Sequence, residues 1–176
     1  MQSTAKEWNV TGRKLFEKSL FAQAASCFEK AGRDIERDIA VAYQKREDAR
    51  GISNARARRE MFKDAATAFQ SCAIRSEGVR NLRQRAAECF VNCEDFPSAA
   101  TNFEAACDYT EAAIQYNKAH LFNDVVRLIR PRDGLNSLVA DDIKTRLLDT
   151  VRIRYLRAHD FECVSRFEFR TCERID

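Results

Sequence analysis

A pattern of small and large apolar residues recurs in this chain at a fixed interval of 13 residues. The small or valine pairs are Ala86-Ala87, Ala99-Ala100, Ala112-Ala113 and Val125-Val126, and the large residues that follow them are Phe90, Phe103, Tyr116 and Ile129. Two further copies lie upstream, out of register, at Phe21–Ala31 and Phe62–Cys72. Within each copy the apolar residues have the spacing of one face of an amphipathic helix.

The copies cannot follow one another along a single helix. A shift of 13 residues rotates the apolar stripe by about 140° at the helical repeat, so the chain must break between copies. Asp95 and Pro97 supply such a break, because proline fits the first turn of a helix but not its interior. Asp108 and Asn123-Asp124 are residue types of helix starts. We therefore predict short antiparallel helices joined by tight turns.

Helices that each need a neighbour to bury their apolar stripe form α-solenoids. The predicted fold is thus all-α, a solenoid of short helix hairpins. The composition agrees, because only 5 glycines and 2 prolines occur in 176 residues, which suits helices better than turn-rich β architectures. The small residues of the repeat are interpreted as core positions where backbones approach closely, and the aromatic residues as the groups that fill the space between them.

The length indicates one domain, residues 1–176, or a fragment of a larger protein. Residues 34–78 are predicted to form longer helices with a break near Gly51–Asn54, and residues 79–131 to form the tandem copies. Residues 132–176 are predicted to be C-terminal helices of a truncated array, with a long helix over Leu138–Leu156 and another copy beginning at Phe161. No stretch is long and apolar enough for a membrane span, and the N-terminus does not resemble a signal peptide.

The first copy resembles a complete tetratricopeptide (TPR) unit over residues 5–33. The resemblance rests on Trp8, Thr11-Gly12 and Leu15 on the first helix, and on Phe21, Ala24, Phe28 and Ala31 on the second. The later copies keep the alanine and aromatic signature but pair into shorter, TPR-like hairpins.

The order of elements also resembles the helical-repeat region of large fungal proteins with UvrD-like helicase domains, which are related to the TPR-and-ankyrin-repeat-containing protein of animals. The segments that carry this resemblance are CFEKAGR, DIERDIAVAYQKREDAR, FKDAATAFQSCA, RAAECFVNCEDF and LFNDVVRLIRP. It implies that this chain is a protein-binding or scaffolding arm, and that ATPase activity lies elsewhere in the parent protein. No phosphate-binding loop motif occurs in this sequence.

Seven cysteines, an odd number without a disulfide spacing, predict a reducing intracellular compartment, the cytoplasm or nucleus. Cys89 and Cys93 share a helix face and could contribute two metal ligands. However, several cysteines occupy repeat positions where other copies have alanine, so buried structural residues are the favoured interpretation. His120 and His159 are interpreted as exposed residues at helix ends. We therefore expect no cofactor, no metal and no catalysis by this chain.

Two functions remain as hypotheses. The first is a non-catalytic scaffold that binds a protein, a peptide or another domain of the parent chain, with Asn9 and Arg13 as candidate contacts. The second is a nucleic-acid-binding accessory module of a helicase, with Arg127, Arg130 and Arg132 as candidate phosphate contacts. Further basic clusters lie at residues 56–63, 75–85 and 152–157. Acidic neighbours accompany them, which is typical of a solvated helix face.

Overall fold

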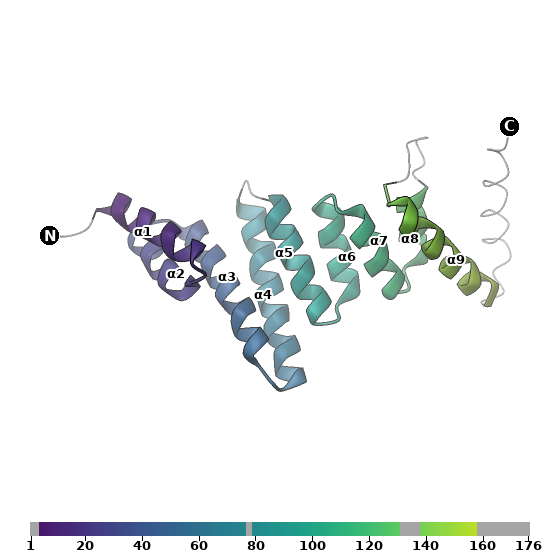
Figure 1. The fold of residues 1–176 in the computed structure, drawn as a ribbon, viewed down its shortest axis with the longest axis horizontal. Helices are drawn as coiled ribbons and strands as arrows, with labels where there is room; N and C mark the ends of the chain where they lie inside the picture. Colours follow the sequence, from purple (N-terminus) through teal and green to yellow (C-terminus); the bar gives the residue numbers. More distant parts are fainter. Residues whose placement is uncertain (1–3, 77–78, 131–137, 158–176) are drawn as a thin grey trace. The chain divides into compact units, whose positions relative to one another are not determined.

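The computed structural model describes residues 4–76, 79–130 and 138–157, and all regular structure in these ranges is helical (Figure 1). One unit, residues 1–108, contains α1 (Ala5–Glu17), α2 (Phe21–Lys30), α3 (Asp34–Gly51), α4 (Ala55–Arg75), α5 (Val79–Asn92) and α6 (Phe96–Ala105). A second unit, residues 109–176, contains α7 (Tyr109–Lys118), α8 (Phe122–Ile129) and α9 (Asp141–Arg157). The all-α prediction is confirmed for the described residues.

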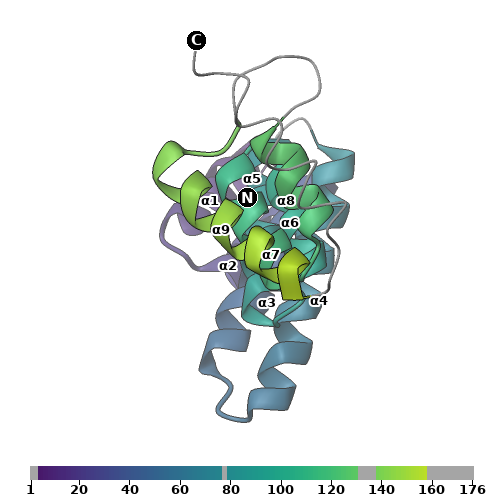
Figure 2. The same ribbon diagram turned by 90° about the vertical axis from the view of Figure 1, so that its right-hand side faces the viewer.

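In the first unit each helix packs against the next one along the chain, from α1 to α6. This packing is compatible with a helical-repeat arrangement. Asp38 near the start of α3 binds Arg75 at the end of α4, with 2.7 Å between Oδ2 and Nη1, so these two helices run antiparallel. Their connecting turn projects beyond the ends of α2 and α5 (Figures 1 and 2), and all residues from Ser53 to Glu60 are exposed.

The same turn closes five of the helices. In each turn the second residue beyond the helix has a left-handed backbone: Ser19, Gly32, Glu94, Cys107 and His120, with φ between 60° and 67°. The N–H of the next residue then donates to the carbonyl of the residue five positions earlier, in the pairs Leu20–Leu15, Arg33–Phe28, Asp95–Phe90, Asp108–Phe103 and Leu121–Tyr116, over 2.8 to 3.0 Å. These are the hydrogen bonds of a Schellman motif.

This turn accounts for the 13-residue interval. The residue that donates the hydrogen bond across five positions is also the N-cap of the following helix. This holds at Leu20, Arg33, Asp95 and Leu121. Glu94, Cys107 and His120 stand 13 residues apart for that reason, as do Ser19 and Gly32. A helix of ten residues, such as α6 or α7, followed by three residues of turn makes one period. The repeat in the sequence is therefore a repeat of helix plus turn, as predicted.

The repeated apolar residues form the core. The alanine pairs at 86–87, 99–100 and 112–113 are fully buried, and the aromatic residues that follow them, Phe90, Phe103 and Tyr116, are buried as well. In α8 the equivalent positions hold Val125, Val126 and Ile129, of which Val125 and Ile129 are buried and Val126 is partly exposed. α9 contributes the buried residues Leu147 and Val151 to the second unit. The interpretation of the repeat as core packing is confirmed at these positions.

The helix boundaries follow the predictions in most places. The break predicted near Gly51–Asn54 is present, because α3 ends at Gly51 and α4 starts after Asn54, whose side chain accepts a hydrogen bond from the N–H of Ala57. Asp95 caps α6 in the same way, and Pro97 lies in the first turn. The copy at Phe62 does not begin a helix, since α4 starts seven residues earlier, at Ala55. None of the helices in the described ranges is long and apolar enough to cross a membrane.

Candidate functional site

The predicted contact residues fall into two groups. Asn9 and Arg13 lie one turn apart on α1 in the first unit. Arg127 lies on α8 and Arg130 directly follows it, in the second unit. Arg132 lies outside the described residues. The structure thus brings together the members of each pair, and the two pairs belong to separate units.

Asn9 and Arg13 differ in their surroundings. The side-chain oxygen of Asn9 is buried and has no hydrogen-bond partner in the described part of the chain. Arg13 is exposed and lies near Glu36 of α3. Burial alone would raise the pKa of Glu36, but the hydrogen bond from Arg33, with the positive charges of Arg33 and Arg13, holds that pKa below its ordinary value. Arg13 therefore contributes positive charge between α1 and α3.

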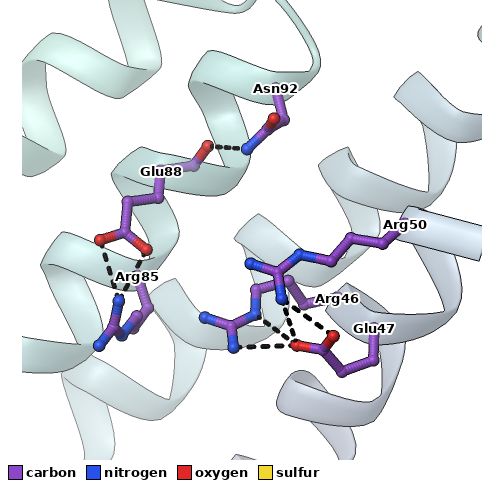
Figure 3. A network of polar contacts seen from close by, with 6 residues as sticks. All are labelled: Arg46, Glu47, Arg50, Arg85, Glu88 and Asn92. Carbon is purple, nitrogen blue, oxygen red and sulfur yellow. Dashed lines mark hydrogen bonds and ion pairs between the residues drawn. The ribbon is translucent and has the colours of Figure 1, made fainter.

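A larger polar cluster, which sequence reasoning did not single out, lies on α3 and α5 (Figure 3). We call it the α3–α5 network, and it consists of Arg46, Glu47, Arg50, Arg85 and Glu88. On α3 the Glu47 carboxylate accepts hydrogen bonds from Arg50, at 2.8 and 2.9 Å, and from Arg46, at 3.0 and 3.3 Å. On α5 Nη1 of Arg85 donates to both carboxylate oxygens of Glu88, at 3.0 and 2.9 Å.

The two halves of the α3–α5 network are linked through side chains between the helices. The hydrogen bonds of Arg85 with Glu88, together with a smaller contribution from Tyr43 of α3, raise the pKa of Arg85. The Arg46 guanidinium lies over the Tyr43 ring, 4.8 Å from its centroid. The Arg46 side chain is only 13% exposed. Arg46 and Arg50 also lie close enough to Cys89 of α5 to oppose the effect of burial on its pKa.

The arginines of the α3–α5 network favour the ionised form of Glu47. Burial alone would raise the pKa of Glu47, but its hydrogen bonds with Arg50 and Arg46 outweigh that effect and hold the pKa below its ordinary value. The Glu47 carboxylate is therefore charged at neutral pH. The only signal in the sequence is the spacing of Glu47 and Arg50, and of Arg85 and Glu88, three residues apart on predicted helices.

The predicted basic clusters are interrupted by carboxylates. Ion pairs join Arg56 to Glu60, Arg59 to Glu94, Arg75 to Asp38, Arg85 to Glu88 and Arg127 to Asp124, over 2.6 to 3.3 Å. Arg83 donates instead to the buried Asn102 side chain at 3.1 Å. Exposed pairs of this kind contribute about 0–1 kcal/mol each to stability, but they reduce the positive potential that a phosphate backbone would meet.

Cysteine and histidine side chains form no reactive cluster among the described residues. Cys27, Cys72 and Cys89 are buried, and burial raises the pKa of the Cys89 thiol to about 12. Cys107 and His120 are exposed at left-handed turn positions, where helix ends were predicted, whereas His159 lies outside the described residues. No group of three or more His, Cys, Asp or Glu side chains in the described ranges could hold a metal ion.

Comparison with known proteins supplies no relative. No protein-family model matches the chain, and neither a curated protein nor a solved structure matches it significantly.

Proposed function

We propose that this chain is a non-catalytic helical-repeat scaffold that binds a protein, either a separate partner or another domain of a longer parent chain. The proposal includes a TPR-like solenoid of helix hairpins as the architecture, and a large helicase-like protein as the parent. The observation that carries it is the α3–α5 network, in which side chains of both charges are held by ion pairs on α3 and α5, the two helices that pack against α4 (Figure 3).

Mixed charge of this kind suits recognition of a protein surface. Arg50, Arg85 and Glu88 are each a third or more exposed, so they can exchange their present partners for complementary charges on another protein. Because their neighbours already order them, little side-chain entropy remains to be lost on binding. Complementary charges then determine which partner binds and how fast it associates.

A capture experiment tests the proposal. The full chain is immobilised and exposed to an extract of the source organism, and the bound proteins are quantified for the wild type and for Arg50→Glu. The matched control is Lys6→Glu, which makes the same charge change at an exposed position in the first turn of α1. We expect specific proteins to be lost from Arg50→Glu and kept by Lys6→Glu. Identical captured sets for all three chains, or no capture above background, would contradict the proposal.

Nucleic-acid binding is the alternative function, and the carboxylates paired with Arg59, Arg75 and Arg127 favour the protein-binding proposal over it. The alternative requires binding of a labelled single strand that weakens steeply with salt. It also requires that binding fall when Arg127, Arg130 and Arg132 are changed to alanine. Anisotropy that stays flat during titration at low salt would exclude it.

A further inference from the structure

A small cleft in the second unit is lined by three rings. It has a volume of about 190 Å³, and its walls are His120, Leu121, Phe122, Asn123, Asp124 and Tyr155. The first five belong to the turn before α8 and to its first turn, and Tyr155 comes from the last turns of α9. We call it the aromatic cleft. Its volume is several times the roughly 30 Å³ that one water molecule occupies in the liquid.

The rings of the aromatic cleft stand at steep angles to one another. The centroids of His120 and Phe122 are 5.8 Å apart with planes at 53°, and those of Phe122 and Tyr155 are 6.3 Å apart with planes at 69°. The Tyr155 hydroxyl forms a hydrogen bond of 2.8 Å with Oδ1 of Asn123, which ties α9 to the start of α8. The Schellman turn at His120 orders the third wall.

One acidic side chain completes the lining. Oδ1 of Asp124 accepts from Nε and Nη2 of Arg127 at 3.3 and 3.2 Å, and the side chains of Asp124 and Arg127 are 38% and 49% exposed. An exposed pair with such long hydrogen bonds contributes about 0–1 kcal/mol. The Asp124 carboxylate, paired with Arg127, thus lies on the same lining as the three aromatic rings.

We propose that the aromatic cleft binds a methylated ammonium group. Aromatic faces attract cations, and rings at steep angles around a small space are the usual walls of quaternary ammonium sites. A trimethylammonium group suits this lining better than a primary ammonium or a guanidinium, because it has no N–H donors. The latter cations would lose hydration and find few acceptors beyond Asp124 and Asn123. This site is independent of the α3–α5 network and of the scaffold proposal.

The first experiment separates charge from shape. The full chain is titrated with choline and with its neutral isostere 3,3-dimethylbutan-1-ol, while the aromatic NMR signals of Phe122 and Tyr155 are followed. We expect saturable shifts with choline and binding of the alcohol weaker by about tenfold, in line with the strength of cation–π contacts. Shifts with choline that do not saturate, or equal affinity for the alcohol, would overturn the proposal.

Variants that remove the negative charge of Asp124 or the positive charge of Arg127 give a second, sharper test. Asp124→Asn should weaken choline binding several-fold, whereas Arg127→Gln should strengthen it, because the nearby positive charge is removed. Neither side chain belongs to the core, so both variants are expected to fold. Phe122→Leu should abolish binding. Unchanged affinity in both Asp124→Asn and Arg127→Gln would refute a cation site.

A third titration identifies the source of the ammonium group. N-acetyl-trimethyllysine amide is compared with N-acetyl-lysine amide and with choline. Tighter binding of the trimethyllysine compound than of choline indicates a methylated protein side chain, and the reverse order indicates a small molecule; either result supports the site. If lysine binds as tightly as trimethyllysine, the proposed preference for a methylated group is wrong.

Discussion

The ring of Tyr43 stands perpendicular to the ring of Phe69, with centroids 4.9 Å apart and planes at 89°. Tyr43 also contacts Phe16 and Phe21, at centroid distances of 5.1 and 5.0 Å. These four rings come from α1, α2, α3 and α4. Tyr43 is therefore the side chain at which the first four helices meet. It also interacts with Arg85 of α5.

The first prediction concerns this contact. Tyr43→Leu loses three ring pairs, each worth about 0.5–1.5 kcal/mol beyond area burial, so we expect a loss of roughly 2–3 kcal/mol in the free energy of unfolding. Tyr43→Phe keeps the rings and loses only the hydroxyl and its interaction with Arg85, which should cost about 1 kcal/mol or less. Urea denaturation of both variants measures the difference. Equal losses would mean that the hydroxyl, and not the ring, joins the helices.

The second prediction concerns Gly12, where α1 and α2 approach closely. A Cβ added there would lie 2.9 Å from the buried Phe28 ring and 3.3 Å from Cβ of Cys27. Gly12→Ala should therefore destabilise the chain by about 1–3 kcal/mol, the usual cost of overpacking.

Gly51→Ala is the matched control, because nothing lies within 4 Å of a Cβ at that helical position. It should be neutral or stabilise by about 0.5–1 kcal/mol through the better helix propensity of alanine. The comparison of the two melting curves is decisive. A Gly12→Ala variant as stable as Gly51→Ala would show that Phe28 can move away at little cost.

The third prediction follows from the five left-handed turn positions. Only Gly32 has the residue that this backbone favours, whereas Ser19 and Cys107 adopt φ of 60° with a side chain. Ser19→Gly and Cys107→Gly should each stabilise the chain, by about 0.5–1 kcal/mol, because the strain of a left-handed Cβ is removed. Gly32→Ala should cost about 1 kcal/mol. Thermal unfolding of the three variants checks the signs, and destabilisation by both glycine substitutions would contradict the turn geometry.

Much of the local structure could be predicted, because the repeat in the sequence reflects the alternation of helices and turns. The alanine and aromatic spacing indicated the buried face, and the 13-residue interval indicated a turn after each helix, including the exposed helix-end position of His120. The start of α4 could not be predicted as well. Its first residues, ARARREMFKD, are mostly good helix formers without a breaker, so nothing separates them from the copy at Phe62.

The candidate sites were harder to predict, because they depend on which helices meet. The charged residues of α3 and α5 form one cluster only when both helices pack against α4. The repeat pattern concerns the apolar residues and does not predict where these polar residues lie. Tyr155 reaches Asn123 across 32 positions of sequence. No periodic signal connects these residues, so the aromatic cleft could not be derived from spacing alone.

The last prediction concerns the acid dependence of the contact between α3 and α4. Burial alone would raise the pKa of Asp38, but the hydrogen bonds from Arg37 and Arg75 outweigh that effect and hold its pKa below the ordinary value. A carboxyl whose pKa is lower in the folded chain than in the unfolded chain stabilises the fold while it is ionised. Its contribution is therefore full at neutral pH and is lost as the pH falls through the acid range.

Asp38→Asn should reduce the free energy of unfolding at neutral pH by about 1 kcal/mol, since the side chains are partly exposed, and should flatten its fall toward acid pH. Asp48→Asn on the same helix is the matched control, because the Asp48 carboxylate accepts a hydrogen bond from the neutral Gln44 side chain at 2.7 Å. Urea denaturation at several pH values compares the three chains. If Asp38→Asn and wild type lose stability in parallel as the pH falls, Asp38 does not contribute to the acid sensitivity.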